Sequence, residues 1–408
     1  MSTRPTRLTC PARSPVTDGD WGLLEPLAGG ATDTSDDAVL GALVDVERAL
    51  LRAWGDLLGE NLDAVASAMR TDRIDRADLL AGSRTGGVPV IPLANQLRRL
   101  AETAVPGSGE YVHAGVTSQD VLDTALVLMA GRALTRARDR LVAAGQALVA
   151  LAESEQTTLA IARTLGQHAA QSTVGVAVAG WLDGVTSALD ALAALELPVQ
   201  LGGAVGTGED IDRLAGRAGA TDELRAGFAA ELGLTDPGRV WHTERSPSLA
   251  IAAAAALIGT ALGRIGRDVA FLARTEIGEF SLGATGGSSA MPHKRNPVDA
   301  VLLTANGLRV AGLVATVHSA AISQDARPAG EWHAEWAALR GLVRLALESA
   351  DVAATMLPAL SVDRAAVERN RALSPDLADD RAATLAASGR IVSTAVRRFQ
   401  SLHLTESP

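Results

Sequence analysis

The longest helical pattern in the chain covers residues 119–155, QDVLDTALVLMAGRALTRARDRLVAAGQALVALAESE. Residues that favour helix dominate this stretch, and Ser118, just before it, is a good N-cap residue. At about 1.5 Å per residue, the helix would exceed about 50 Å in length. A helix this long buries little surface alone, so the stretch predicts a bundle of long helices.

Three further segments have the same helical composition. Small residues on their faces, as in Ala252–Ala256, allow helices to approach closely, which suits packing between subunits. The lengths favour an oligomer, and a single closed monomeric bundle is the alternative. The segments run from Thr173 to Leu195, from Ser248 to Glu279, and from just after Pro297 to about Ile322.

The fold class that we expect is all-α, with a long central helical bundle and small helical domains at its two ends. The expected N-terminal helical domain covers residues 1–105, and the central bundle covers residues 106–355. A shortened C-terminal helical segment covers residues 356–408. Loops connect the long helices, and one of these loops is expected at residues 163–172.

Composition and charge exclude several classes of protein. The chain has 408 residues, and its 37 basic and 47 acidic residues give a net charge of −10, which argues against general binding to nucleic acid or to an anionic membrane. Cys10 is the only cysteine, which excludes a disulfide framework and fits a cytoplasmic location. Residues 1–20 lack the apolar core of a signal peptide, and the most apolar stretch, residues 248–263, is shorter than the roughly 20 residues that span a bilayer. We therefore expect no membrane partner.

The strongest functional signal is the loop GGSSAMPHKRNP, residues 286–297. Its glycines permit unusual backbone angles, and Ser288 and Ser289 supply two adjacent hydroxyls. Lys294 is the only lysine in the chain and supplies a positive charge, while Asn296 supplies an amide. Together these groups suit binding a carboxylate and moving a proton beside it.

This loop resembles the signature of the fumarase/aspartase superfamily. That signature reads G-S-S-x-M-P-x-K-x-N-P, and residues 287–297 match it in full. The resemblance implies a bundle of long helices and a homotetramer whose active sites draw on three subunits. It also implies a small polycarboxylate substrate, and it implies neither a cofactor nor a metal.

Two other regions resemble the same superfamily. The first is HAGVTSQD, residues 113–120, where Thr117 and Ser118 stand at a helix start whose free N–H groups and dipole favour a carboxylate. The second is RTLGQH, residues 163–168, which resembles the Arg-Thr-His-Gly-Gln stretch of adenylosuccinate lyases. Leu165 stands where that histidine would be, and leucine cannot donate a proton.

Smaller motifs resemble the 3-carboxy-cis,cis-muconate cycloisomerase branch of the superfamily. They are Ile91-Pro92-Leu93, Trp241-His242-Thr243 and Trp332-His333-Ala334-Glu335-Trp336. The chain departs from this branch at residues 325–331, which implies a difference in substrate selectivity. Its segment after Leu360 is also shorter than the C-terminal helical domain that is usual in this family.

The resemblance implies a cycloisomerase that converts 3-carboxy-cis,cis-muconate to a carboxy-muconolactone in aromatic catabolism. A carboxylate would add to a double bond, and an aci-carboxylate intermediate would then be protonated. The alternative within the superfamily is a lyase of the nitrosuccinate or adenylosuccinate type that releases fumarate. A non-catalytic helical scaffold is the alternative outside it.

The resemblance also assigns roles to particular residues. The expected catalytic residues are Ser288, His113 and His168, with Ser288 as the proton-transferring serine. We expect no metal ligands, because Asp120 and Asp123 are ordinary helix-start acids with no histidine or cysteine at a metal-binding spacing. The residues expected to bind substrate are Thr117, Ser118, Gln119, Thr164, Gln167, Ser289, Met291, Lys294, Asn296 and Arg327.

Overall fold

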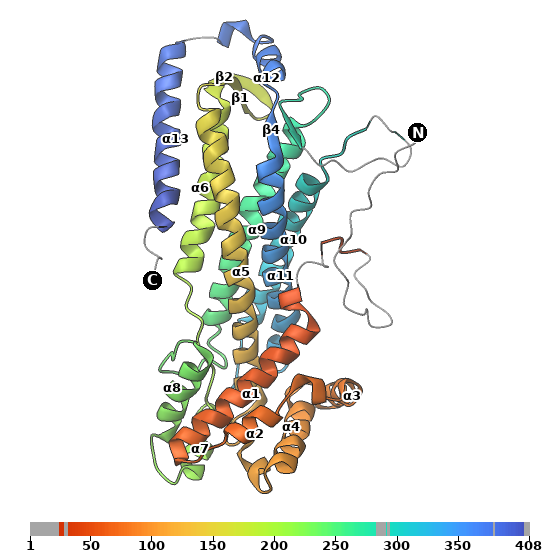
Figure 1. Ribbon diagram of the computed structural model, residues 1–408, viewed down its shortest axis with the longest axis vertical. Helices are drawn as coiled ribbons and strands as arrows, with labels where there is room; N and C mark the ends of the chain where they lie inside the picture. The colour runs from red at the N-terminus through yellow and green to blue at the C-terminus, as the bar shows by residue number, and fades with distance from the viewer. Residues whose placement is uncertain (1–23, 28–31, 283–290, 292–293, 378–379, 404–408) are drawn as a thin grey trace, which may run out of the picture.

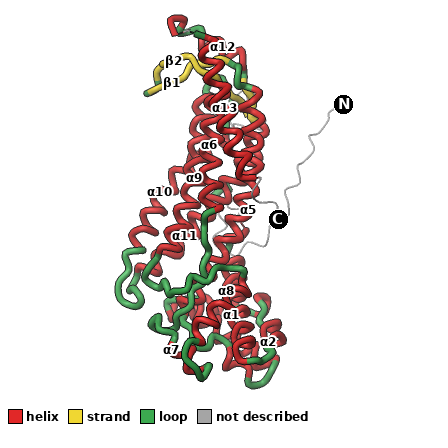
Figure 2. The backbone as a smooth tube through the Cα atoms, turned by 90° about the vertical axis from the view of Figure 1, so that its left-hand side faces the viewer, coloured by secondary structure: helices red, strands yellow, loops and turns green. Residues whose placement is uncertain are grey.

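The predicted bundle of long helices is confirmed. A computed structural model of the chain describes residues 24–27, 32–282, 291, 294–377 and 380–403. Five long helices lie side by side along the long axis of the molecule, as Figures 1 and 2 show. They are α5 (Ser118–Ser154), α6 (Val174–Ala193), α9 (Ser246–Leu272), α10 (Val298–Ala320) and α11 (Glu331–Met356).

Helices α9 and α10 pack closely and run antiparallel, because small residues line their contact. A Cβ added at Gly263 would lie 2.8 Å from the Cα of Gly307, which leaves no space for a side chain. One turn away on each side, Gly266 faces Ala300 and Gly259 faces Val310. The small residues of these segments therefore allow the two helices to approach closely, as their sequence predicts.

Helix α1 (Asp36–Leu58) and several shorter helices cluster at one end of the bundle, at the bottom of Figure 1. The helices from the N-terminal part of the chain pack together with two helices that lie between α6 and α9 in the sequence. One of these two, α8, contacts α1 directly. The division into three domains remains a prediction. The helices at this end are α1 (Asp36–Leu58), α2 (Asp63–Ala68), α3 (Arg76–Gly86), α4 (Val90–Ala104), α7 (Glu209–Leu214) and α8 (Ala220–Leu232).

The opposite end of the bundle carries two small antiparallel sheets. The first is a hairpin of β1 (Leu159–Thr164) and β2 (Gln167–Thr173), so the loop expected at residues 163–172 is wrong. Its two-residue turn, Leu165-Gly166, has φ angles of 51° and 80°, the combination that a type I′ hairpin turn requires. Glycine meets this requirement without strain, whereas leucine rarely adopts such a φ, which is why the sequence did not indicate a turn here.

The second sheet begins close to the predicted end of a long helix, and that helix ends earlier than predicted. β3 (Phe280–Leu282) pairs with β4 (Leu360–Val362), and the chain turns into β3 through a hydrogen bond from the Glu279 N–H to the Leu272 carbonyl. Helix α9 therefore ends at Leu272 and not at Glu279. Helices α12 (Arg364–Arg371) and α13 (Arg381–His403) follow β4. Helix α13 lies along α6.

Three of the long helices, α6, α9 and α10, have the length and apolar composition to cross a membrane. In the structure they pack into the bundle, and 56% of the most apolar window of α9 is buried, against 28% for α10. Helix α10 thus presents an apolar face on the outside of the chain, with Val301 and Leu308 exposed by 52% and 71%.

Candidate active site

The start of α5 is held by reciprocal hydrogen bonds of a capping box. Thr117 is the N-cap, one residue before the expected Ser118, and its side chain accepts from the backbone of Asp120. The Asp120 carboxylate in turn accepts from the Thr117 N–H at 3.0 Å. This arrangement occupies some of the free N–H groups of the first turn and fixes the direction in which the chain enters α5.

Asp120 also ties two distant loops to this helix start. Its Oδ1 accepts from the Gly202 N–H and from Nε2 of His242, at 2.9 and 2.8 Å, and its Oδ2 accepts from the Gly203 N–H at 2.9 Å. Asp120 and His242 are both buried. The carboxylate therefore organises three chain segments, which explains why an acid is tolerated at this depth.

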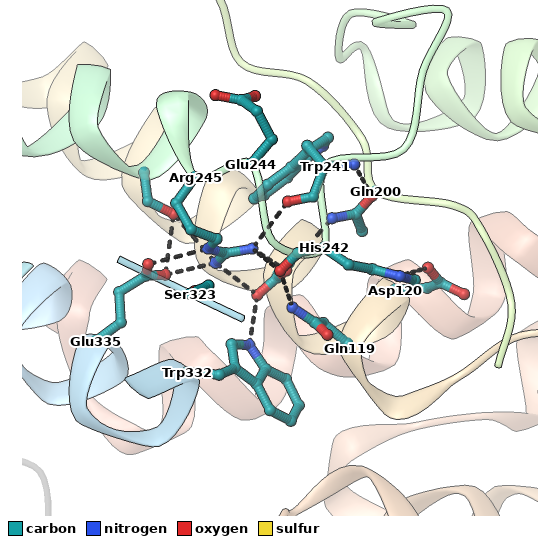
Figure 3. Close-up of polar contacts among 12 residues, drawn as sticks. Gln119, Asp120, Gln200, Trp241, His242, Glu244, Arg245, Ser323, Trp332 and Glu335 are labelled. Atoms are coloured by element: carbon teal, nitrogen blue, oxygen red, sulfur yellow. Dashed lines mark hydrogen bonds and ion pairs between the residues drawn. The ribbon is translucent and has the colours of Figure 1, made fainter. Parts of the chain in front are cut away.

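Beside this contact lies a buried ion cluster of one cation and two anions, shown in Figure 3. Nη1 of Arg245 lies 2.6 Å from Asp123, and Nη2 lies 2.6 Å from Glu335. The Trp332 indole donates to Asp123 at 2.8 Å, and the Ser248 hydroxyl donates to Glu335 at 2.9 Å. The cluster thus joins the starts of α5, α9 and α11 at one end of the bundle.

Arg327 brings a further cation to the start of α5. Its guanidinium donates to the Thr117 hydroxyl at 2.8 Å and to the Gln119 side-chain oxygen at 3.2 Å. It also donates to the Ala204 carbonyl at 3.2 Å, while the Gln119 amide donates to the His242 carbonyl at 2.7 Å. The structure therefore brings together three of the expected substrate-binding residues, Thr117, Gln119 and Arg327.

His113 lies in the turn that leads into α5. Its Nδ1 is 2.6 Å from Oε1 of Glu47 on α1, and its backbone has an uncommon positive φ of 61°. Two anchors hold the turn, namely Trp54, whose indole donates to the Ala114 carbonyl at 3.1 Å, and Arg98, which donates to the Val112 carbonyl at 3.3 Å. The expected catalytic histidine is thus fixed by α1 and α4.

The signature loop is only partly described. Ser288 and Ser289 lie outside the described residues. Lys294 is exposed, and its N–H donates to the Met291 carbonyl at 3.0 Å, while Asn296 is half-buried just before α10. These residues lie near the end of α9, because α10 runs antiparallel to it, and α9 is 27 residues long. At about 1.5 Å per residue, they stand roughly 40 Å from Arg245 at the other end.

The hairpin residues lie at that far end too. Thr164 and Gln167 are exposed beside the turn, and Leu165 at its tip is fully exposed. His168 is held by Ser374, since its Nδ1 lies 2.7 Å from the serine hydroxyl. The hairpin follows the 37-residue helix α5, so it is separated by about 55 Å from Thr117, at the start of that helix.

A single chain therefore does not bring the expected site residues together. The cluster of Thr117, Gln119 and Arg327 stands at one end of the bundle, whereas the hairpin and the described part of the signature loop stand at the other. A site that uses all three regions has to draw on different copies of the chain.

Sequence reasoning missed several residues that build the α5 end. Glu47 and Arg245 were not singled out, and Asp120 and Asp123 were taken for ordinary helix-start acids. Each is a charged residue that lies buried, and the three acids adjoin apolar residues in the sequence, whereas Arg245 does not. A charged residue in such a position is the signal that could have revealed the acids, because buried charges need partners.

Comparisons with known proteins define first the class and then the family. A family described as lyase matches residues 93–312, which makes the chain an enzyme of the lyase family. The chain is 40% identical to nitrosuccinate lyase of Streptomyces davaonensis, over 84% of this chain and 75% of that protein. It is 36% identical to 3-carboxy-cis,cis-muconate cycloisomerase of Pseudomonas aeruginosa, over 88% of this chain and 78% of that protein.

The fold of the chain is also similar to a solved structure of a related enzyme. The fold matches the crystal structure of 3-carboxy-cis,cis-muconate lactonizing enzyme from Pseudomonas putida with a TM-score of 0.76 and 32% identity, over 92% of this chain and 87% of that one. The chain belongs to the fumarase/aspartase superfamily of lyases. Within it, the chain resembles both the cycloisomerases and nitrosuccinate lyase.

Proposed function

We propose that this enzyme closes 3-carboxy-cis,cis-muconate to a carboxy-muconolactone, a step of aromatic catabolism. The observation that carries the proposal is Leu165, at the exposed tip of the hairpin, where adenylosuccinate lyases have a histidine. A leaving amine has to be protonated, and leucine donates no proton. A carboxylate has an ordinary pKa near 4 and leaves as an anion without an acid, so lactone chemistry fits this chain.

The ring closure needs groups that stabilise negative charge. One substrate carboxylate oxygen forms a bond to an alkene carbon, and the displaced electron pair moves onto the carbon next to another carboxylate. That carboxylate becomes a doubly charged aci-carboxylate, which a proton then quenches at carbon. We assign its stabilisation to Lys294 and Asn296 together with Thr117 and Ser118, and the proton transfer to Ser288, which therefore needs a pocket that stabilises its oxyanion.

Nitrosuccinate is the second candidate substrate. The 40% identity to nitrosuccinate lyase favours it, and so does the same leucine, because nitrite is also a weakly basic leaving group. In that reaction a base removes the proton next to a carboxylate, the C–N bond breaks, and nitrite leaves with the electron pair to give fumarate. Both candidates use the same stabilisation of an aci-carboxylate.

Because three regions have to meet, we propose a homotetramer whose active sites take residues from three chains. Supporting this, the start of α5 and the hairpin lie at opposite ends of one helix. The apolar outer face of α10 also needs a cover, which neighbouring copies of α10 would provide. We place the enzyme in the cytoplasm on the strength of its single cysteine.

A substrate panel tests the function. We expect 3-carboxy-cis,cis-muconate, or in second place nitrosuccinate, to be turned over with a kcat/KM at least about 100-fold above that for adenylosuccinate, since an unprotonated amine is a poor leaving group. Ultraviolet absorbance of the diene or of fumarate reports all three reactions under one condition. Efficient cleavage of adenylosuccinate, with the other two compounds inert, would reject both the leaving-group argument and the cycloisomerase assignment.

Complementation tests the shared site. A His168→Ala protein and a Ser288→Ala protein should each be inactive, whereas their mixture after subunit exchange should recover part of the activity. The reason is that some sites in mixed tetramers contain neither substitution. Activity assays on the mixture, with subunit exchange verified by mass spectrometry, make the measurement. A monomer by light scattering, or no recovery after verified exchange, would contradict the proposal.

A further inference from the structure

Glu47 is a buried acid that the proposed chemistry does not use. It lies on α1, its side chain is fully buried, and its Oε1 accepts from His113 at 2.6 Å. Within the part of the chain that the structure describes, its other oxygen, Oε2, is buried and has no hydrogen-bond partner. Burying a carboxylate with so few partners costs free energy, so its position calls for an explanation beyond packing.

A comparison with Asp120 shows how unusual this is. Both acids are buried within the same end of the bundle, but Asp120 accepts four hydrogen bonds, three of them from backbone N–H groups. The charge of Asp120 is therefore spread over three chain segments. Glu47 instead has one hydrogen-bond partner in the described chain, the His113 ring, and its charge is directed at that ring.

The contact also decides which nitrogen of His113 is available. Because a carboxylate only accepts hydrogen bonds, Nδ1 carries the proton in this pair. The other nitrogen, Nε2, makes no hydrogen bond to any residue that the structure describes. The ring is 13% exposed, and the turn that carries it is fixed by Trp54 and Arg98. Among the described residues nothing occupies Nε2, so this nitrogen of a firmly held ring is available for a ligand.

The charged groups around His113 favour its cationic form. Burial lowers the pKa of His113, but the charge of Glu47 and its hydrogen bond outweigh this effect and raise the pKa above its ordinary value. Of the other charged groups nearby, Arg98 on α4 lowers the pKa and Asp120 on α5 raises it. As a cation, His113 donates from Nε2, and the ligand that it suits is a carboxylate.

We propose that Glu47 is a positioning residue, which orients His113 and keeps it cationic so that Nε2–H binds a carboxylate of the substrate. This rests on the proposed function in one respect, namely that the substrate is a polycarboxylate bound at the α5 end. His113 stands four residues before Thr117, which Arg327 contacts at 2.8 Å. Two cations, His113 and Arg327, are therefore available at this helix entry for a substrate carboxylate.

Carboxylate binding depends on pH because only the cationic form of His113 donates from Nε2. Carboxylate affinity is full while His113 is protonated and is lost as the pH rises through its pKa in the folded protein. Since Glu47 raises that pKa, the affinity should persist above about 6.5, the ordinary histidine pKa. Without the charge of Glu47, the loss should begin at lower pH.

Glu47→Gln tests the proposal, because the amide keeps an oxygen for Nδ1–H and removes only the charge. The NMR titration midpoint of His113 in the substrate-free protein should fall, with the signal assigned by its absence from a His113→Gln protein. With the panel substrate that the wild type turns over, KM at neutral pH should rise by about tenfold, because a neutral ring that keeps its proton on Nδ1 presents Nε2 as an acceptor and no longer as a charged donor. At low pH, where both proteins hold the cation, KM and kcat should match the wild type.

Asp45→Asn is the matched control. Asp45 lies on the same helix, and its Oδ2 pairs with Arg132 at 2.8 Å and not with His113. This variant should leave both the His113 midpoint and the KM profile unchanged.

The possible outcomes are distinct. An unchanged midpoint in Glu47→Gln would overturn the role of Glu47, and a lowered midpoint with an unchanged KM profile would overturn the role of His113 in binding a carboxylate. A wild-type protein that is inactive on the whole panel would reject the proposed function. The midpoint alone would then decide whether Glu47 charges His113.

Discussion

Arg245→Leu is expected to cause the largest loss of stability of any single substitution at the α5 end. It would leave Asp123 and Glu335, which are almost fully buried, without their shared cation. Removing one partner of a buried ion pair costs about 3–5 kcal/mol, a large part of the stability of an ordinary domain. Urea denaturation followed by circular dichroism measures the change, and for a protein of low stability it would appear as a failure to accumulate folded material.

A surface arginine on the same helix serves as the control. Arg264 lies on α9, its side chain is 60% exposed, and it is 3.9 Å from Asp268. Arg264→Leu should change the free energy of unfolding by less than about 1 kcal/mol, because an exposed pair contributes little. If both variants lost the same free energy of unfolding, burial would not explain the contribution of the Arg245 cluster to stability.

Ser288→Ala is expected to have the largest effect on activity while the fold and the assembly stay intact. Removing a group that transfers a proton lowers kcat by about 10²–10⁴-fold. KM should change little if Lys294 and Asn296 hold the substrate. Steady-state kinetics with the preferred panel substrate make the measurement, and circular dichroism with light scattering checks the fold and the oligomer.

Ser281→Ala is the matched control for this serine. Ser281 lies on β3 shortly before the signature loop, is exposed, and shares a hydrogen bond of 2.8 Å with Ser361. Its loss should leave kcat unchanged. If the Ser288→Ala protein kept the wild-type kcat, the assignment of the proton transfer to Ser288 would be wrong.

The helical framework could be predicted because local composition and periodicity decide it. Four of the long helices were expected within a few residues of their observed bounds, except at the end of α9, where pairing with β4 stops the helix early. That pairing joins residues about 80 positions apart in the chain. Helix ends set by such distant contacts leave no local signal.

The turn of the β1–β2 hairpin also could not be predicted from the local sequence. Leu165 is not a turn residue by its own preference, and the ladder between β1 and β2 imposes its positive φ. Local reasoning favoured a loop there because neither strand alternates strongly between apolar and polar residues.

What the sequence by itself determined is the family of this protein and the chemical character of its candidate site. The match over residues 287–297 and the substitution of leucine at position 165 are properties of residue identity, which folding does not alter. The lengths of the helices likewise follow from local preferences that act within a few turns.

Only the tertiary structure decided how these residues are grouped. It placed Thr117 beside Arg327, the hairpin and the described signature residues at the far end of the bundle, and Glu47 behind His113. The last pair is separated by 66 positions in the chain. Such contacts depend on how whole helices pack, since a charge is buried only where the fold brings a partner to it, and one residue's type cannot reveal which partner that is.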